Sequence, residues 1–263
     1  MSRLVYVAED GQLVSCDSGG SDWRRLTHPM DGASEGGWRS HQRSPGWTWP
    51  CPSPDGQTIA AFHHPSDPSF PAQLRLVDLD GVGERQVLSL DGALPVYLQW
   101  SPDGERVAAL LQDGESLQLH GCHRQVLGVS SEIESGSPLF FQWLGTTGRV
   151  LVHVGDVGGD ARILIRSLGD GEDHIIGQTQ GVITAPQLLK DRVWLSVPSR
   201  RSTRFICYDP DTGGPGERRS IEGWFQLTPG PEDSGEVLVG LDPGSQARGL
   251  GLMDWGRGTQ RWL

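Results

Sequence analysis

The sequence contains no asparagine and a single lysine, Lys190, so it offers no acceptor for N-glycosylation. Positive charge is sparse as well, because 22 lysine and arginine residues stand against 33 aspartate and glutamate residues, for a net charge of −11. Basic residues cluster only in pairs such as Arg24-Arg25. Binding to a phosphate backbone needs a concentrated positive patch. The composition therefore argues against nucleic acid as a partner.

Long apolar runs are also missing, since no stretch approaches the 18 residues of a membrane-spanning helix. The apolar stretch near the N-terminus meets Glu9 and Asp10, and is too short for the hydrophobic region of a signal peptide. We therefore expect no membrane insertion and a cytoplasmic location.

The four cysteines are scattered and form no C-x-x-C pair. This pattern excludes a small disulfide scaffold, and the cysteines lack the usual spacing of zinc ligands. His63-His64 and residues 120–123 are the dense clusters of metal-capable side chains. Alternation along a strand would let His120 and Cys122 share a face. The favoured interpretation of this second cluster is a solvated strand end and tight turn. We expect free thiols, no metal and no other cofactor.

Glycine and proline, by contrast, are abundant. The 37 glycines and 18 prolines make up about a fifth of the chain, against a usual share of roughly 12%. Short blocks of valine, isoleucine, leucine and tryptophan recur between them, so the chain can bury a core. This combination predicts many short strands joined by many turns.

A repeated phrase organises these strands. Residues 53–61 (SPDGQTIAA) return as residues 101–109 (SPDGERVAA), and weaker copies follow at residues 144–152, 189–195 and 233–239. Pro-Asp-Gly favours a turn, because proline presets φ, aspartate caps the turn and glycine accepts positive φ. Four short strands in a repeat of about 44 residues are typical of a β-propeller blade. In the third unit we expect strands at residues 98–100, 106–111, 116–120 and 124–127.

The pattern W-S-P-D-G-x-x-[IV]-A at residues 100–108, with LVDLDG at 76–81 and RRLT at 24–27, resembles the WD40-like repeats of the TolB β-propeller family. The resemblance spans nearly the whole chain. It implies an all-β fold, a single β-propeller of about six four-stranded blades. The first unit offers only three strands, which leaves open a three-stranded blade or early strands shifted inward.

We expect one domain over residues 1–263. Its units lie at about 1–27, 47–90, 95–130, 138–178, 182–221 and 224–263, with a long inter-blade loop at 28–46.

That long loop is the least repeat-like part of the chain, and loops of such length in a compact domain are functional or disordered. In a four-stranded blade, inter-blade loops share a rim with the loops joining second and third strands. Exposed tryptophan and arginine are favoured interface anchors. We therefore predict a rim that binds a protein of acidic or mixed surface. Its residues are Trp38, Arg39, His41, Arg43, Trp47, His63, His64, Phe70, Arg200 and Arg201.

The propeller units occupy the whole chain and leave no room for the peptidase domain that often accompanies propellers in the family it resembles. Because fold does not fix function, two alternatives stay beside the expected non-enzymatic protein-binding scaffold. One is a lyase or hydrolase that acts on a small molecule at the channel mouth with a metal. The other is a TolB-like periplasmic accessory protein. A small-molecule ligand in the channel is compatible with the fold.

Overall fold

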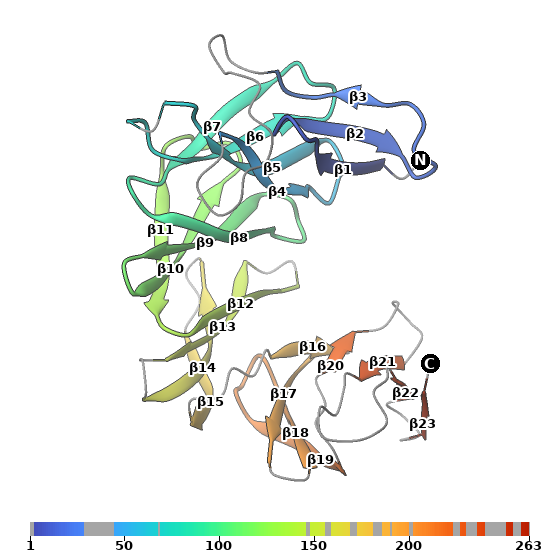
Figure 1. Ribbon diagram of the computed structural model, residues 1–263. Helices are drawn as coiled ribbons and strands as arrows, with labels where there is room; N and C mark the ends of the chain where they lie inside the picture. The colour runs from blue at the N-terminus through green and yellow to red at the C-terminus, as the bar shows by residue number, and fades with distance from the viewer. Residues whose placement is uncertain are drawn as a thin grey trace. The chain divides into compact units, whose positions relative to one another are not determined.

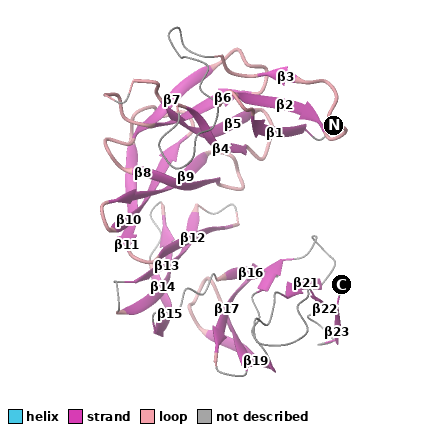
Figure 2. Cartoon of the chain, viewed as in Figure 1, coloured by secondary structure: helices cyan, strands magenta, loops and turns pink. Residues whose placement is uncertain are grey.

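The computed structural model describes residues 3–28, 45–67, 69–145, 148–155, 159–168, 173–180, 186–189, 191–199, 202–222, 227–229, 236–239, 251–254 and 259–262. Figure 2 shows strands and loops throughout these segments. They contain no helix of the length and apolarity needed to cross a membrane. The chain divides into two compact units, Met1–Ser137 and Pro138–Leu263, which are described separately.

The first unit contains three antiparallel sheets in which chain neighbours pair as they do in a meander (Figure 1). One sheet has three strands and the other two have four each. The strands are β1 (Arg3–Val7), β2 (Leu13–Asp17) and β3 (Arg24–Arg25), then β4 (Gly46–Pro52), β5 (Thr58–His64), β6 (Gln73–Asp78) and β7 (Glu84–Ser89), and finally β8 (Leu94–Trp100), β9 (Arg106–Asp113), β10 (Ser116–His123) and β11 (Ser130–Gly136).

The second unit contains three four-stranded antiparallel sheets, again in chain order. Their strands are β12 (Leu139–Leu144), β13 (Arg149–Gly155), β14 (Asp160–Ser167) and β15 (His174–Gln180); β16 (Gln187–Leu189), β17 (Arg192–Pro198), β18 (Ser202–Tyr208) and β19 (Pro215–Glu222); and β20 (Leu227–Pro229), β21 (Glu236–Val239), β22 (Gly251–Asp254) and β23 (Thr259–Trp262). The predicted all-β fold of short antiparallel strands is confirmed, and the first sheet has three strands among the described residues.

The predicted fourth strand of the third unit, residues 124–127, is wrong. The third strand, β10, runs on to His123, because Cys122 and His123 still pair with Val107 and Arg106 of β9. Residues 124–129 then form the connection, and β11 follows at Ser130–Gly136. Residues 120–123 therefore belong to a strand, which also corrects their placement in a solvated turn.

The repeated Ser-Pro-Asp-Gly phrase closes the same turn twice. In the third sheet, Ser101 Oγ donates to Asp103 Oδ1 at 2.6 Å, and the Gly104 amide donates to the Ser101 carbonyl at 2.9 Å. Gly104 has a φ of +73°, which an L side chain adopts only with strain. The turn at residues 53–58 repeats these bonds, including that from Ser53 Oγ to Asp55 Oδ1. The sequence repeat is thus a repeat of one hydrogen-bonded turn.

The second strands of the sheets are buried on both faces. In β9, Val107 to Leu111 are all at most 3% exposed, and β5 and β13 show the same pattern. In the first unit, one face of β5 packs with β8 and β9 in a single apolar cluster that includes Phe62, Leu98 and Trp100. Strands buried on both sides need no apolar–polar alternation, which explains the continuous apolar runs.

Trp100 joins the second and third sheets of the first unit. Its ring is 7% exposed within the apolar cluster, and its Nε1 donates to the Cys51 carbonyl at 2.8 Å. The guanidinium of Arg124 lies 5.7 Å from the centroid of the Trp100 ring. Arg124 also donates to Asp55 Oδ2 at 2.8 Å and to Thr58 Oγ1 at 2.7 Å. Arg124, which follows strand β10 of the third sheet, therefore binds the turn at residues 53–58 of the second sheet.

The second unit has a comparable fastening. Arg149 at the start of β13 donates to the Pro210 carbonyl at 3.1 Å and pairs with Asp211 at 2.8 Å. Beneath it, β13 and β17 share an apolar cluster that contains Leu151 and Val193, both fully buried. An arginine over a turn of the neighbouring sheet is thus a feature of both units.

Replacing Trp100 by alanine should lower the free energy of unfolding by about 3–5 kcal/mol, because the packed ring leaves a cavity and the Cys51 carbonyl loses its donor. Denaturant unfolding would measure this loss. Trp23, which is 53% exposed, provides the matched control, and Trp23→Ala should cost less than about 1 kcal/mol. Equal costs for the two substitutions would contradict the assigned packing.

Hydrogen bonds from Ser53 and Arg124 lower the pKa of Asp55 to about 2 from its ordinary 3.8. As the pH falls, the Asp55 carboxylate is therefore protonated in the unfolded chain before it is protonated in the folded chain. The free energy of unfolding that this carboxylate contributes above pH 4 should be lost as the pH falls toward 2. Asp55→Asn should make that loss shallower and cost less than about 1 kcal/mol at pH 7, because the pair is half exposed. Asp80→Asn, at a turn acid outside the ion pairs of the described residues, is the matched control.

Candidate functional site

A pocket of about 310 Å³ opens where the β5–β6 loop meets the connection from β7 to β8, within the first unit. Polar and apolar groups contribute about equally to the walls, and one acid and one histidine are among the lining residues. The lining residues are His64, Ser69, Phe70, Pro71, Ala72, Asp91, Gly92, Ala93, Leu94 and Pro95. Two loops from different sheets thus build one concave site.

Backbone hydrogen bonds hold the two loops together. The Leu90 amide donates to the Ala72 carbonyl at 2.9 Å, and the Ala93 amide donates to the Leu90 carbonyl at 2.8 Å. Asp91 and Gly92 lie at the tip of this tight turn with φ values of 41° and 102°, as Asp-Gly hairpin turns require. Leu90 itself is only 4% exposed and anchors the turn in the core. The floor of the pocket is therefore fixed by the sheets.

The mouth of the pocket carries exposed apolar side chains. Phe70 is 60% exposed and Leu94, at the start of β8, is 39% exposed, and both line the pocket. The Asp67 carboxylate accepts the Ser69 amide at 2.9 Å, and the Asp67 carbonyl accepts the Phe70 amide at 3.2 Å. This turn presents the phenyl ring to solvent beside a hollow. Exposed aromatic groups that rim a pocket are typical of binding surfaces.

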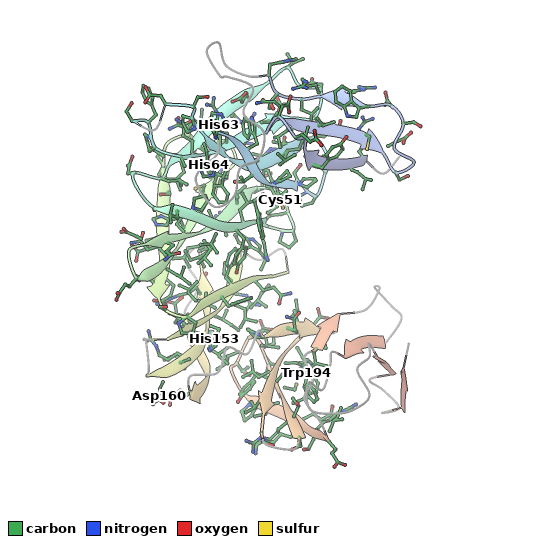
Figure 3. All side chains as sticks on the ribbon, viewed as in Figure 1. Cys51, His63, His64, His153, Asp160 and Trp194 are labelled. Atoms are coloured by element: carbon green, nitrogen blue, oxygen red, sulfur yellow. The ribbon has the colours of Figure 1, made fainter. Side chains whose placement is uncertain are left out.

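His63 and His64 end strand β5 just before the pocket loop (Figure 3). Their roles differ, because the ring of His63 packs against Trp47 with 4.8 Å between centroids, whereas His64 lines the pocket. His64 Nε2 lies 3.3 Å from Thr48 Oγ1. Burial, with smaller contributions from Arg75 and His64, lowers the pKa of His63 to about 4. His63 therefore stays neutral at physiological pH and supports the site from below.

Trp47 is not part of an exposed surface, which corrects the prediction that its side chain contacts a partner. It is 3% exposed in an apolar cluster with Leu13 and Ile59, and its amide donates to the Gly11 carbonyl at 2.8 Å. The close approach requires glycine at position 46, where a Cβ would lie 2.8 Å from the same carbonyl oxygen. This approach of the two backbones holds the Trp47 side chain in the core.

Trp49 is an exposed aromatic residue that the predicted rim did not include. A bulge between Thr48 and Cys51 interrupts the pairing of β4 with β5, and Trp49 takes a φ of 56° there. Its side chain is 54% exposed and lies 6.3 Å from the Tyr97 ring, centroid to centroid. Only the unusual Trp-Pro-Cys-Pro spacing before the repeated turn hints at the bulge.

Several predicted rim residues lie outside the described residues. These are Trp38, Arg39, His41 and Arg43 in the long loop, with Arg200 and Arg201 in the second unit. Their part in binding stays a prediction. Residues 32–36 (GASEG) carry the letters of a G-x-S-x-G elbow and also lie outside the described residues.

The second histidine cluster is divided between core and surface. Cys122 joins the apolar cluster, and burial raises its thiol pKa to about 12. His120 is half-buried and lies near Gln118 and Ser130, whose oxygens are 3.2 and 3.4 Å from its two ring nitrogens. Across the described segments, no three histidine, cysteine or acidic residues gather as metal ligands would.

The low pKa of His63 predicts an acid-linked loss of stability. The unfolded chain binds the proton near pH 6.5 and the folded chain only near pH 4, so stability should fall as the pH drops between these values. His63→Phe should remove this part of the loss, as measured by thermal unfolding at several pH values. His123→Gln, at a more exposed ring, is the control. A His63 ring that titrates near pH 6.5 by NMR would contradict the assigned burial.

The sequence matches no protein-family profile and no curated protein. Solved structures are similar in fold. A prolyl endopeptidase matches 99% of this chain with 13% identity and a TM-score of 0.69, and the chain spans 40% of that protein. An oligogalacturonate lyase in complex with manganese matches 99% of the chain with 14% identity, a TM-score of 0.64 and 73% of its own length.

TolB from Acinetobacter baumannii matches 99% of the chain at 15% identity, with a TM-score of 0.51 and 63% of its length covered. Identities this low bear on the fold alone. Together with the repeated antiparallel four-stranded sheets, they establish that the chain has the fold of a WD40-like, TolB-type β-propeller.

Proposed function

We propose that this chain is a non-enzymatic binding module of the cytoplasm that docks a protein partner. The proposed surface consists of the lining residues of the β5–β6 loop, residues 69–72, and of the segment after β7, residues 91–95; we call it the pocket rim. The observation that carries the proposal is the pairing of a fixed hollow with two exposed apolar side chains that line it, Phe70 and Leu94. Such a hollow accepts an anchor residue from a partner.

The hydrogen bonds of the polar lining favour binding over acyl transfer. Ser69, His64 and Asp91 are the residue types of a catalytic triad, in which each member bonds to the next. Here Ser69 bonds to Asp67, and Asp91 accepts a bond from Ser89 Oγ at 2.8 Å. These bonds hold each side chain against its own loop. They leave a pocket whose walls combine apolar side chains with polar groups.

The similar proteins fit either kind of role. The lyase and the endopeptidase are enzymes by name, and TolB is not named for a reaction. Propellers host unrelated functions, so the proposal rests on the pocket rim rather than on these likenesses.

Replacing Phe70 and Leu94 together by serine should abolish capture of the partner from native lysate, because both apolar contacts at the mouth are lost. The melting temperature should stay nearly unchanged, since Phe70 is 60% and Leu94 39% exposed. Capture with the tagged chain, followed by mass spectrometry, measures the loss.

Val82→Ser is the matched control, because Val82 is 87% exposed on the β6–β7 turn and does not line the pocket. It should retain the same partner as the native chain. A double variant that still captures that partner, or a Val82 variant that loses it equally, would place the binding surface elsewhere.

A further inference from the structure

The pocket rim carries an acidic residue and no arginine or lysine. Asp91 stands at the mouth, Asp67 lies two residues before Ser69, and no arginine or lysine is among the lining residues. The chain as a whole carries a net charge of −11. An acidic segment that approached this hollow would be repelled, and a basic one would be attracted over the Debye length.

Asp91 is positioned for an external cation. Ser89 Oγ donates to Asp91 Oδ1, which leaves Oδ2 for another donor. The exposed side chain forms no ion pair with any described residue. By comparison, Asp10, Asp55 and Asp78 in the same unit each pair with an arginine. The turn that holds Asp91 is itself fixed by the bond from Ala93 to Leu90.

The shape of the hollow matches an amphipathic basic side chain. Phe70, Pro71 and Leu94 provide apolar surface for the stem, and Asp91 belongs to the same lining. Arginine and lysine bury their methylene stems along apolar surface while the charged head stays near water. A guanidinium also stacks on an aromatic face such as the exposed Phe70 ring.

We propose that the pocket rim takes the side chain of an arginine or lysine from its protein partner, with the stem between Phe70 and Leu94 and the cation on Asp91. This inference rests on the proposed function and specifies its partner. It replaces the partner of acidic or mixed surface, which was predicted from arginines that lie outside the described residues.

A peptide library displayed on phage and selected on the immobilised full chain would test this proposal. The peptides recovered should share a basic residue beside an apolar one. The probe is then a synthetic copy of the most enriched peptide, and a second copy in which citrulline replaces arginine, or norleucine replaces lysine. Asp91→Asn should lower the affinity for the basic peptide about three- to tenfold at low salt, as expected for the loss of an exposed charge pair. The neutral copy should bind both proteins alike, within about twofold.

Asp80→Asn removes an exposed turn acid away from the pocket and should bind the basic peptide as the native chain does. Recovered peptides without a basic residue, or an Asp91→Asn variant with unchanged affinity, would overturn the inference. If such peptides still lose binding to Phe70→Ser, the pocket rim remains the docking surface and only the basic anchor is wrong. Peptides that bind Phe70→Ser and the native chain equally, or a selection without binders, would overturn the proposed function as well.

Discussion

The structure depends on burying both faces of second strands such as β5, β9 and β13. A strand such as β9 cannot meet water on either side, because residues 107–111 are at most 3% exposed. A lone sheet would leave one apolar face bare, so each sheet needs a neighbour. Trp100 and Arg124 show how the chain secures that contact, with a buried indole bonded to the neighbouring backbone and an arginine over the neighbouring turn.

This constraint leaves the loops for recognition. The sheet interiors consist of apolar side chains whose replacement costs stability, while the connections tolerate change. In the first unit, residues 69–72 and 91–95 line one hollow, and the bond from the Leu90 amide to the Ala72 carbonyl joins the two segments. His63 shows the boundary between the two regions, because its ring packs on Trp47 while the next residue, His64, lines the pocket. Rigid sheets thus position an exposed phenyl ring and an exposed carboxylate.

Local signals predicted much of the fold. The Ser-Pro-Asp-Gly phrase encodes a turn closed by its own side chains, and the apolar runs after it encode strands β5 and β9. Features that depend on distant contacts were not predictable. The Arg124–Asp55 pair joins residues 69 apart in sequence, and the burial of Trp47 depends on the approach of Gly11 to Gly46. The pocket was missed for the same reason, since two loops from different sheets create it.

Hydrogen exchange of the chain, alone and with its captured partner, tests the central claim most directly. Amides in a bound loop exchange more slowly than in the free loop, because the partner excludes water and suppresses opening. The account predicts slower exchange at residues 67–72 and 91–96 and no change at residues 78–83, the β6–β7 turn away from the pocket. Slower exchange at residues 78–83, with residues 67–72 and 91–96 unchanged, would contradict it.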